Sequence, residues 1–201
     1  QPALAEILVA RRMVAGVLLI GISGYLAYTF AGSTVLAPHA GVLTFIAVPF
    51  VFVVGFLIAG VAGYMAGLIG ASNSPISGIG ILGIVICATI MSLAVEPTVD
   101  NRTALVAFAL FVTAIVFACA TISNDNLQDL KTGQLVGASP MRQQIALIVG
   151  VVAGAAVIPS VLNLLAKAYG FAGAANLGVV AANPLPAPQA TLISALAQGV
   201  I

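Results

Sequence analysis

Charged side chains are scarce in this sequence, and their scarcity defines the class of protein. Only 5% of the 201 residues are charged, whereas 62% are hydrophobic. An average soluble domain has about 25% charged residues, so a water-facing surface of this size would lack the polar side chains to cover it. The apolar residues are therefore expected to face lipid as well as protein, which predicts an integral membrane protein in contact with a lipid bilayer.

Tryptophan is absent, and histidine and cysteine are nearly so. One His and two Cys (Cys87 and Cys119, both inside apolar runs) cannot build an ordinary metal site or a disulfide framework. The sequence has no phosphate-binding loop, no HExxH pair and no nucleophile elbow. A net charge of +1 is too small to attract the phosphate backbone of a nucleic acid. These absences predict a protein that is not an enzyme, has no cofactor or metal site and has no nucleic-acid partner.

Six apolar stretches have the length, or nearly the length, of membrane helices, for which about 20 apolar residues are needed. We predict an all-α, polytopic transmembrane helical bundle in one domain over residues 1–201, with five full helices and a partial sixth. Two stretches contain an internal proline, and Pro159 is expected to kink its helix or end it early. The predicted helices lie near residues 13–30, 43–70, 76–95, 103–123, 144–165 and 189–201.

The placement of lysine and arginine predicts an orientation. If the residues before the first helix are cytoplasmic, the connections at 71–75 and 124–143 are cytoplasmic too. That side then carries four of the six basic residues, as expected for a multi-pass protein of the cell (inner) membrane. The stretch 166–188, rich in Gly, Ala and Pro, is an extended loop or a partly re-entrant segment. The four cytoplasmic residues are Arg11, Arg12, Lys131 and Arg142, against Arg102 and Lys167 outside.

A short polar break separates the second and third apolar stretches. The simpler interpretation is a tight capped turn, because Ser and Asn cap helix starts and Pro suits a first helical turn. The alternative is a discontinuous-helix site, whose free backbone groups bind a substrate carboxylate or a coupling ion. The candidate substrate- or ion-binding residues are Ser72, Asn73, Ser74, Pro75, Ser77 and Gly78.

The longest hydrophilic stretch, residues 124–143, follows the fourth apolar segment. We interpret it as a solvated loop with a short amphipathic turn that ends at Gly133, or alternatively as a gate or cation-binding rim. Two of its carboxylates are four residues apart and share a face if the segment is helical. A further carboxylate, in the loop at the other membrane side, is a solvated residue or a proton-coupling group. The gate or coupling candidates are Asn124, Asp125, Asp129 and Glu96.

These two polar regions resemble the oligopeptide transporter family, bacterial type, which includes peptide carriers and is related to the yellow-stripe-like metal-chelate carriers. The strings are SNSPISG at residues 72–78 and DNLQDLKTG at residues 125–133, within a resemblance over residues 63–200. The resemblance implies a secondary carrier that uses a cation gradient, usually of protons, to import small peptides or metal–chelate complexes. Family members are several times longer, so we expect a fragment that works with the remaining part of the same transporter.

Two other functions are alternatives at this point. A channel or pore subunit would use a polar break as a filter, but a filter normally has a ring of charges or a repeated carbonyl loop. A non-transporting membrane module would have no inward-facing polar break. The polar break and the long hydrophilic stretch together favour the carrier.

Overall fold

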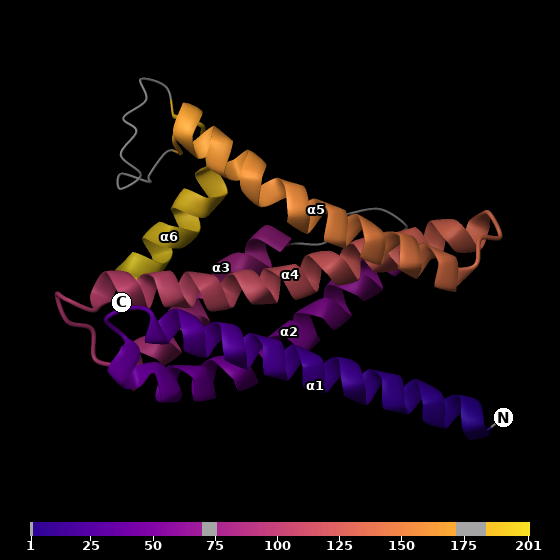
Figure 1. Cartoon of the computed structure of the whole chain (residues 1–201), viewed down its shortest axis with the longest axis horizontal. Coiled ribbons are helices and arrows are strands. Elements are labelled where there is room, and N and C mark those ends of the chain that lie inside the picture. The colour runs from indigo at the N-terminus through magenta and orange to yellow at the C-terminus, as the bar shows by residue number, and fades with distance from the viewer. Residues whose placement is uncertain (1, 70–75, 172–183) are drawn as a thin grey trace.

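The computed structural model describes residues 2–69, 76–171 and 184–201, and these residues form a helical bundle (Figure 1). Four segments are long and apolar enough to cross a membrane: Ala37–Ile69, Ser77–Ala94, Arg102–Leu135 and Pro140–Ala168. The all-α class is therefore confirmed. The elements are α1 (Pro2–Gly32), the short 3₁₀ helix η1 (Ala37–His39), α2 (Ala40–Ile69), α3 (Ile76–Ala94), α4 (Arg102–Leu135), α5 (Pro140–Ala168) and α6 (Pro188–Val200).

Both internal prolines lie inside continuous helices. Pro49 is within α2, and Pro159 is within α5, which continues for nine further residues to Ala168. The expectation that Pro159 ends its helix early is therefore wrong. A proline in a membrane helix is tolerated because adjacent backbone and side-chain groups compensate the freed carbonyl. Helix α1 is also longer than predicted, because it begins at Pro2 rather than near residue 13.

The largest difference from the sequence-based prediction is the length of α4. The helix does not end near residue 123 but continues through Asp125 and Asp129 to Leu135, so the solvated-loop interpretation of this stretch is wrong. Gly133 does not end it either. The helix ends in a Schellman motif, in which the Ala138 amide donates to the Gly133 carbonyl at 2.8 Å. Gly137 supplies the left-handed residue of that motif, with φ of 73°.

Helix α4 is the centre of the bundle. Its most extensive contacts are with α2, and it also packs against α1, α3, α5 and α6. Phe108 and Val112 of α4 are fully buried, together with Leu43 of α2 and Ile84 of α3. Phe30 of α1 stacks on Phe111 of α4 with ring centroids 4.9 Å apart. The core therefore surrounds the first two-thirds of α4.

Small residues allow the neighbouring helices to approach α4 closely. The ring of Phe117 occupies the space that a Cβ on Gly80 of α3 would need. Gly63 of α2 faces Ser123 and Leu127 in the same way. One turn before Gly63, the Ala59 carbonyl accepts a hydrogen bond from the Ser123 hydroxyl at 2.7 Å. Close backbone approach of this kind is the usual packing mode of helices in lipid.

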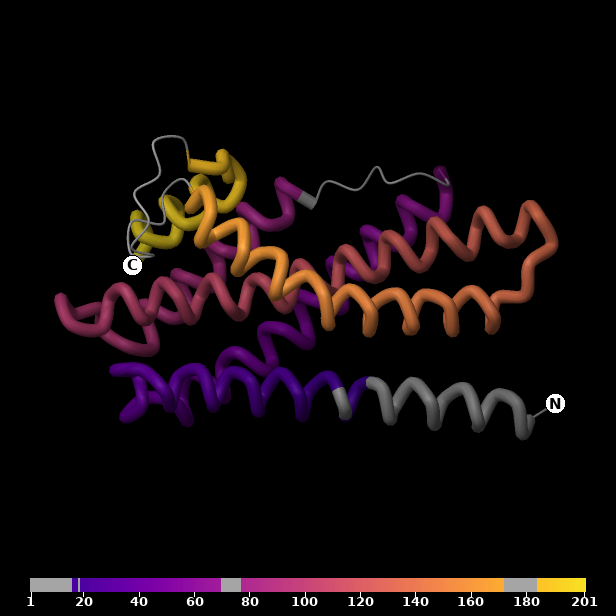
Figure 2. The backbone as a smooth tube through the Cα atoms, turned by 45° about the horizontal axis from the view of Figure 1, so that its top comes forward, coloured from indigo at the N-terminus to yellow at the C-terminus, as the bar shows by residue number. Residues whose placement is uncertain are grey.

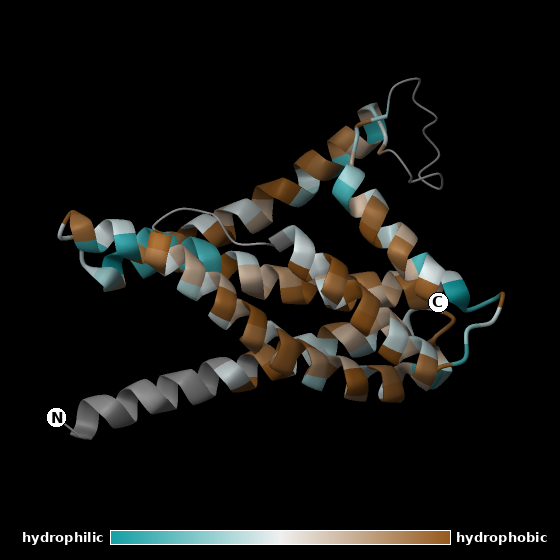
Figure 3. Cartoon of the chain, turned by 180° about the vertical axis from the view of Figure 1, so that it is seen from behind, coloured by the Kyte–Doolittle hydropathy of each residue, from teal (hydrophilic) through white to brown (hydrophobic). Residues whose placement is uncertain are grey.

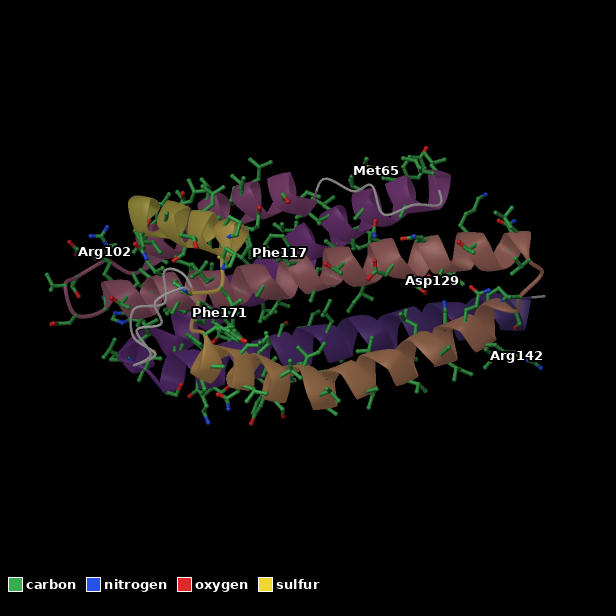
Figure 4. The ribbon with its side chains drawn as sticks, turned by 90° about the horizontal axis from the view of Figure 1, so that it is seen from above. Met65, Arg102, Phe117, Asp129, Arg142 and Phe171 are labelled. Carbon is green, nitrogen blue, oxygen red and sulfur yellow. The ribbon has the colours of Figure 1, made fainter. Side chains whose placement is uncertain are left out.

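The connections gather at two ends of the bundle. The C-terminal end of α2 and the α4–α5 connection lie at one end, and the connections at 33–39 and 95–101 lie at the other (Figure 2). Arg142 and Arg102 are accordingly at opposite ends (Figure 4). At the second end, Arg102 donates from Nη2 to the Gln198 carbonyl at 2.7 Å and so joins the start of α4 to the end of α6. Which end is cytoplasmic stays a prediction.

Candidate functional site

The polar break after α2 is only partly within the described residues. Ser72, Asn73, Ser74 and Pro75 lie outside them, so the choice between a capped turn and a discontinuous helix stays a prediction. Ser77 and Gly78 are in the first turn of α3, and both are exposed. A Cβ added to Gly78 would meet no atom within 4 Å. The described part of the break therefore faces open space rather than the core of the bundle.

Glu96 lies in the connection between α3 and α4, just before Arg102, and Asp129 lies towards the other end of α4 (Figure 4). Its side chain is exposed, and its backbone carbonyl accepts a hydrogen bond from Asn101 Nδ2 at 3.1 Å. Asn101 Oδ1 in turn accepts from the Thr98 amide at 2.8 Å, which orders the connection before α4. No single site can contain both Glu96 and Asp129.

The other three candidates are on α4, where its surface changes from apolar to polar. Asn124 is 1% exposed, and its Nδ2 donates to Asp125 Oδ1 at 3.1 Å. Asp125 and Asp129 are both exposed and one helical turn apart, as expected for a helix. The structure thus brings these three residues together on one helix, with the amide facing the core and the carboxylates facing outward.

An open cleft of about 910 Å³ lies between the last turns of α4 and the first two-thirds of α5. On the α4 side the lining residues are Asp129, Thr132, Gly133 and Val136, followed by Ala138 in the connection. The Asp129 carboxylate is on the side of α4 that faces α5 (Figure 4). The α5 wall of the cleft is apolar beyond Gln143. Small side chains predominate in that wall, which contains Ala146, Leu147, Gly150, Val151, Gly154, Ala155 and Ile158.

Gln143 lies at the polar end of the cleft. Its amide group covers Gly133, and a Cβ at that glycine would collide with it. Gln143 Nε2 donates to the Ala138 carbonyl at 3.4 Å, whereas Oε1 is buried and accepts no hydrogen bond from the described residues. A buried acceptor without a donor costs about 1–3 kcal/mol, and this oxygen is closed off from the open part of the cleft.

The charge of the cleft is of one sign. Asp129 is the only ionisable residue among those that line it. Thr132 Oγ1 donates to the Gln128 carbonyl at 3.1 Å, which leaves its oxygen lone pairs directed away from that bond. No group of three or more His, Cys, Asp or Glu side chains suited to a metal ion occurs among the described residues. The cleft therefore favours a cationic or hydrogen-bond-donating ligand that also has apolar parts.

Sequence reasoning selected Asp129 but missed the other polar residues of the cleft. Thr132 and Gly133 follow Asp129 at helical spacing, so they share its face once the segment is known to be helix. Gln143 is on the next helix, and nothing in its sequence neighbourhood shows that it folds back over Gly133. Recognising the Schellman signal at Gly137 would have predicted the hairpin that joins the two walls.

Comparison with known proteins identifies a family and a relative of this chain. Residues 10–201 match the family model described as OPT oligopeptide transporter protein. A Haemophilus influenzae (strain ATCC 51907 / DSM 11121 / KW20 / Rd) protein named "Putative oligopeptide transporter" is 49% identical over 140 residues. That match covers 67% of this chain and 22% of the relative, so the chain spans less than a quarter of the relative's length. No solved structure matches the chain.

Proposed function

Because this chain belongs to the oligopeptide transporter family, we propose that it is part of a secondary carrier that moves small peptides across the cell (inner) membrane. The four apolar segments of sufficient length make it a multi-pass membrane chain. The matched relative is several times longer than this chain. We therefore include in the proposal that further segments of a longer polypeptide pack against these helices and complete the transport pathway.

The cleft between α4 and α5 is the observation that carries this proposal. Its volume of about 910 Å³ is within the usual range of small-molecule sites, roughly 300–1,000 Å³. A polar end with a carboxylate is followed by an apolar wall of small side chains. A short peptide has the same composition, with polar termini and variable, partly apolar side chains.

Protons are the proposed coupling ion. Exposed carboxylates lie towards both ends of the bundle, with Asp125 and Asp129 in the second half of α4 and Glu96 in the α3–α4 connection. Ionisable groups near a bilayer are frequent parts of proton pathways. In this proposal the buried Asn124 holds Asp125 in position through its hydrogen bond. The polar break at residues 72–75 completes the substrate pathway from the α2–α3 side.

Uptake by sealed vesicles that contain the full-length carrier tests the proposal. We expect labelled di- to tetrapeptides to accumulate when the outside is acidic, and a protonophore to abolish the accumulation. Iron chelates are measured in parallel as the second substrate class that the family resemblance implies. Peptide uptake that ignores the pH gradient would refute proton coupling. Flux that never saturates with peptide concentration would favour the channel, and no peptide flux at all would refute the carrier.

A further inference from the structure

The apolar part of α5 has two different long faces. The face towards the cleft has two glycines at its centre, Gly150 and Gly154, which are four residues apart and both line the cleft; we call it the glycine face. Small residues on one face are typical of helix–helix contacts in membranes. The opposite face carries exposed, branched aliphatic side chains, which suit contact with lipid. These are Ile145, Ile148, Val149 and Val152.

Helix α4 does not cover the glycine face. The two helices meet at the hairpin, where Gln143 lies over Gly133, and they diverge from there (Figure 1). A Cβ added to Gly150 would meet no atom within 4 Å. If α5 instead closed onto α4, its apolar wall would take the Asp129 carboxylate out of water without supplying a donor, which is costly. The glycine face therefore needs a partner other than α4.

The cleft itself is also incomplete. Small-molecule sites in proteins bury roughly 70–90% of the surface of their ligand. Here α4 and α5 supply two walls, and the cleft is open between them. A carrier that holds a peptide in this cleft therefore needs a third wall.

The length of the matched relative indicates where such a wall comes from. The 140 matched residues are 22% of the relative, so more than three-quarters of it lies outside the match. A helix joined to α5 through the same polypeptide has a far higher effective concentration at the glycine face than a separate molecule has. It is therefore favoured over a second copy of this chain.

We propose that a transmembrane helix from the remaining part of the same transporter packs on the glycine face at Gly150 and Gly154 and forms the third wall of the cleft. The polar end at Asp129 stays open to substrate, and the face with Ile148 and Val152 stays in lipid. The inference rests on the proposed carrier function, and it adds which surface of this chain joins the rest of the transporter.

Two adjacent valines give a matched test in the full-length carrier. Val151 lines the cleft and is 50% exposed, whereas Val152 is 65% exposed on the opposite face. Val151→Cys and Val152→Cys are spin-labelled separately, in a carrier whose native cysteines, including Cys87 and Cys119, are replaced by alanine. Electron paramagnetic resonance in lipid vesicles then measures the mobility of each label and its collisions with oxygen, which concentrates in lipid, and with a water-soluble nickel chelate.

We expect the Val152→Cys label to be mobile and accessible to oxygen. The Val151→Cys label should be immobilised, with a several-fold lower accessibility to both reagents. Equal, high accessibility to oxygen at the two positions would overturn the inference, because lipid would then cover both faces. High accessibility of the Val151→Cys label to the nickel chelate would also overturn it and would identify a water-filled cleft with two walls. Protection that disappears in detergent-dispersed monomers would identify a second copy of the chain as the partner instead.

Gly150→Ala gives a second measurement that needs no label. In this chain alone the added methyl group has free space, but a helix packed on Gly150 would collide with it. We expect Gly150→Ala to lower the melting temperature of the full-length carrier. Val152→Ile adds a methyl group to the opposite face and should leave that temperature unchanged. An unchanged or raised melting temperature in Gly150→Ala would mean that no helix contacts the glycine face.

Neither measurement depends on transport, so the two proposals fail separately. Peptide uptake by a carrier without protection at Val151→Cys would overturn this inference and leave the proposed function intact. Protection at Val151→Cys in a carrier that takes up no peptide would overturn the proposed function and leave the helix contact in place.

Discussion

Helices α4 and α5 are both long and apolar enough to cross a membrane, but they differ completely in burial. Helix α4 has ten buried residues, whereas α5 has none. Both helices nevertheless contain many hydrophobic residues (Figure 3). Among the described elements, α5 contacts only α4, near the hairpin that joins them. Apolar composition alone therefore does not reveal whether a membrane helix is surrounded by protein or by lipid, because both environments are apolar.

Shape is what distinguishes the two helices. The partners of α4 present glycines where its large side chains need space, as Gly80 does for Phe117. Helix α5 has glycines of its own, but a Cβ at Gly150 would meet no atom within 4 Å. Packing in lipid depends on such complementary surfaces rather than on a hydrophobic driving force. The surface of α5 thus has the composition of an interface, but α4 is its only partner among the described elements.

Phe108→Ala should give the largest difference between the two regions. Phe108 is fully buried beside Phe30, with ring centroids 6.0 Å apart, so its removal leaves a cavity. We expect a loss of about 3 kcal/mol in the free energy of unfolding. Thermal unfolding in detergent, followed by a thiol-reactive dye, would measure it, because Cys87 is buried and Cys119 is half-buried in the folded chain.

The matched variant for α5 is Leu162→Ala. Leu162 is 49% exposed and makes no contribution to the core, so the expected change is about 0.5 kcal/mol or less. Equal losses for the two variants would contradict the contrast between the helices and would mean that α5 is packed as tightly as α4.

Substitution of glycine by alanine should have opposite signs in the two regions. Gly80→Ala places a methyl group in the ring of Phe117 and should cost about 1–3 kcal/mol through overpacking. Gly150→Ala has free space and should stabilise the helix by about 0.5–1 kcal/mol, because alanine loses less backbone entropy. The same thiol-dye melts would measure both. A destabilising Gly150→Ala would reveal a close partner on α5.

Ser123→Ala should give the smallest effect. The Ser123 hydroxyl donates to the Ala59 carbonyl of α2 at 2.7 Å, and hydrogen bonds between membrane helices contribute about 0.6 kcal/mol on average. Ser160→Ala on the exposed surface of α5 is the control and should leave the melting temperature unchanged. A loss well above 1 kcal/mol at Ser123 would mean that the Gly63 contact reorganises as well.

Much of the fold could be predicted from hydropathy, because segments that cross a lipid bilayer must consist mainly of apolar residues. The predicted helices near 43–70 and 76–95 agree closely with Ala40–Ile69 and Ile76–Ala94. Hydropathy did not predict where α4 ends, because it measures affinity for lipid and not the ability to form a helix. The polar turns after Ser123 stay helical since Asn124 and Gly133 are buried against the rest of the bundle while the carboxylates face outward.

The candidate site was predictable only in part. Asp129 could be selected as a carboxylate in a distinctive string, but the cleft around it depends on how α5 folds back after Gly137. The position of Gln143 over Gly133 is a tertiary contact with no local signal. Family resemblance correctly indicated an oligopeptide transporter relative.

The unbroken length of α4 has a mechanical consequence. At 1.5 Å per residue, the 34 residues of α4 extend for about 51 Å, well beyond the roughly 30 Å of a bilayer's hydrocarbon layer. Phe108 and Asp129 are about 32 Å apart along this rod. If the packed end tilts by about 10°, simple geometry displaces the Asp129 end by about 5 Å. A small tilt of α4 within the tightly packed core would therefore move its Asp129 end, and with it the mouth of the cleft, sideways by several times the shift in the core.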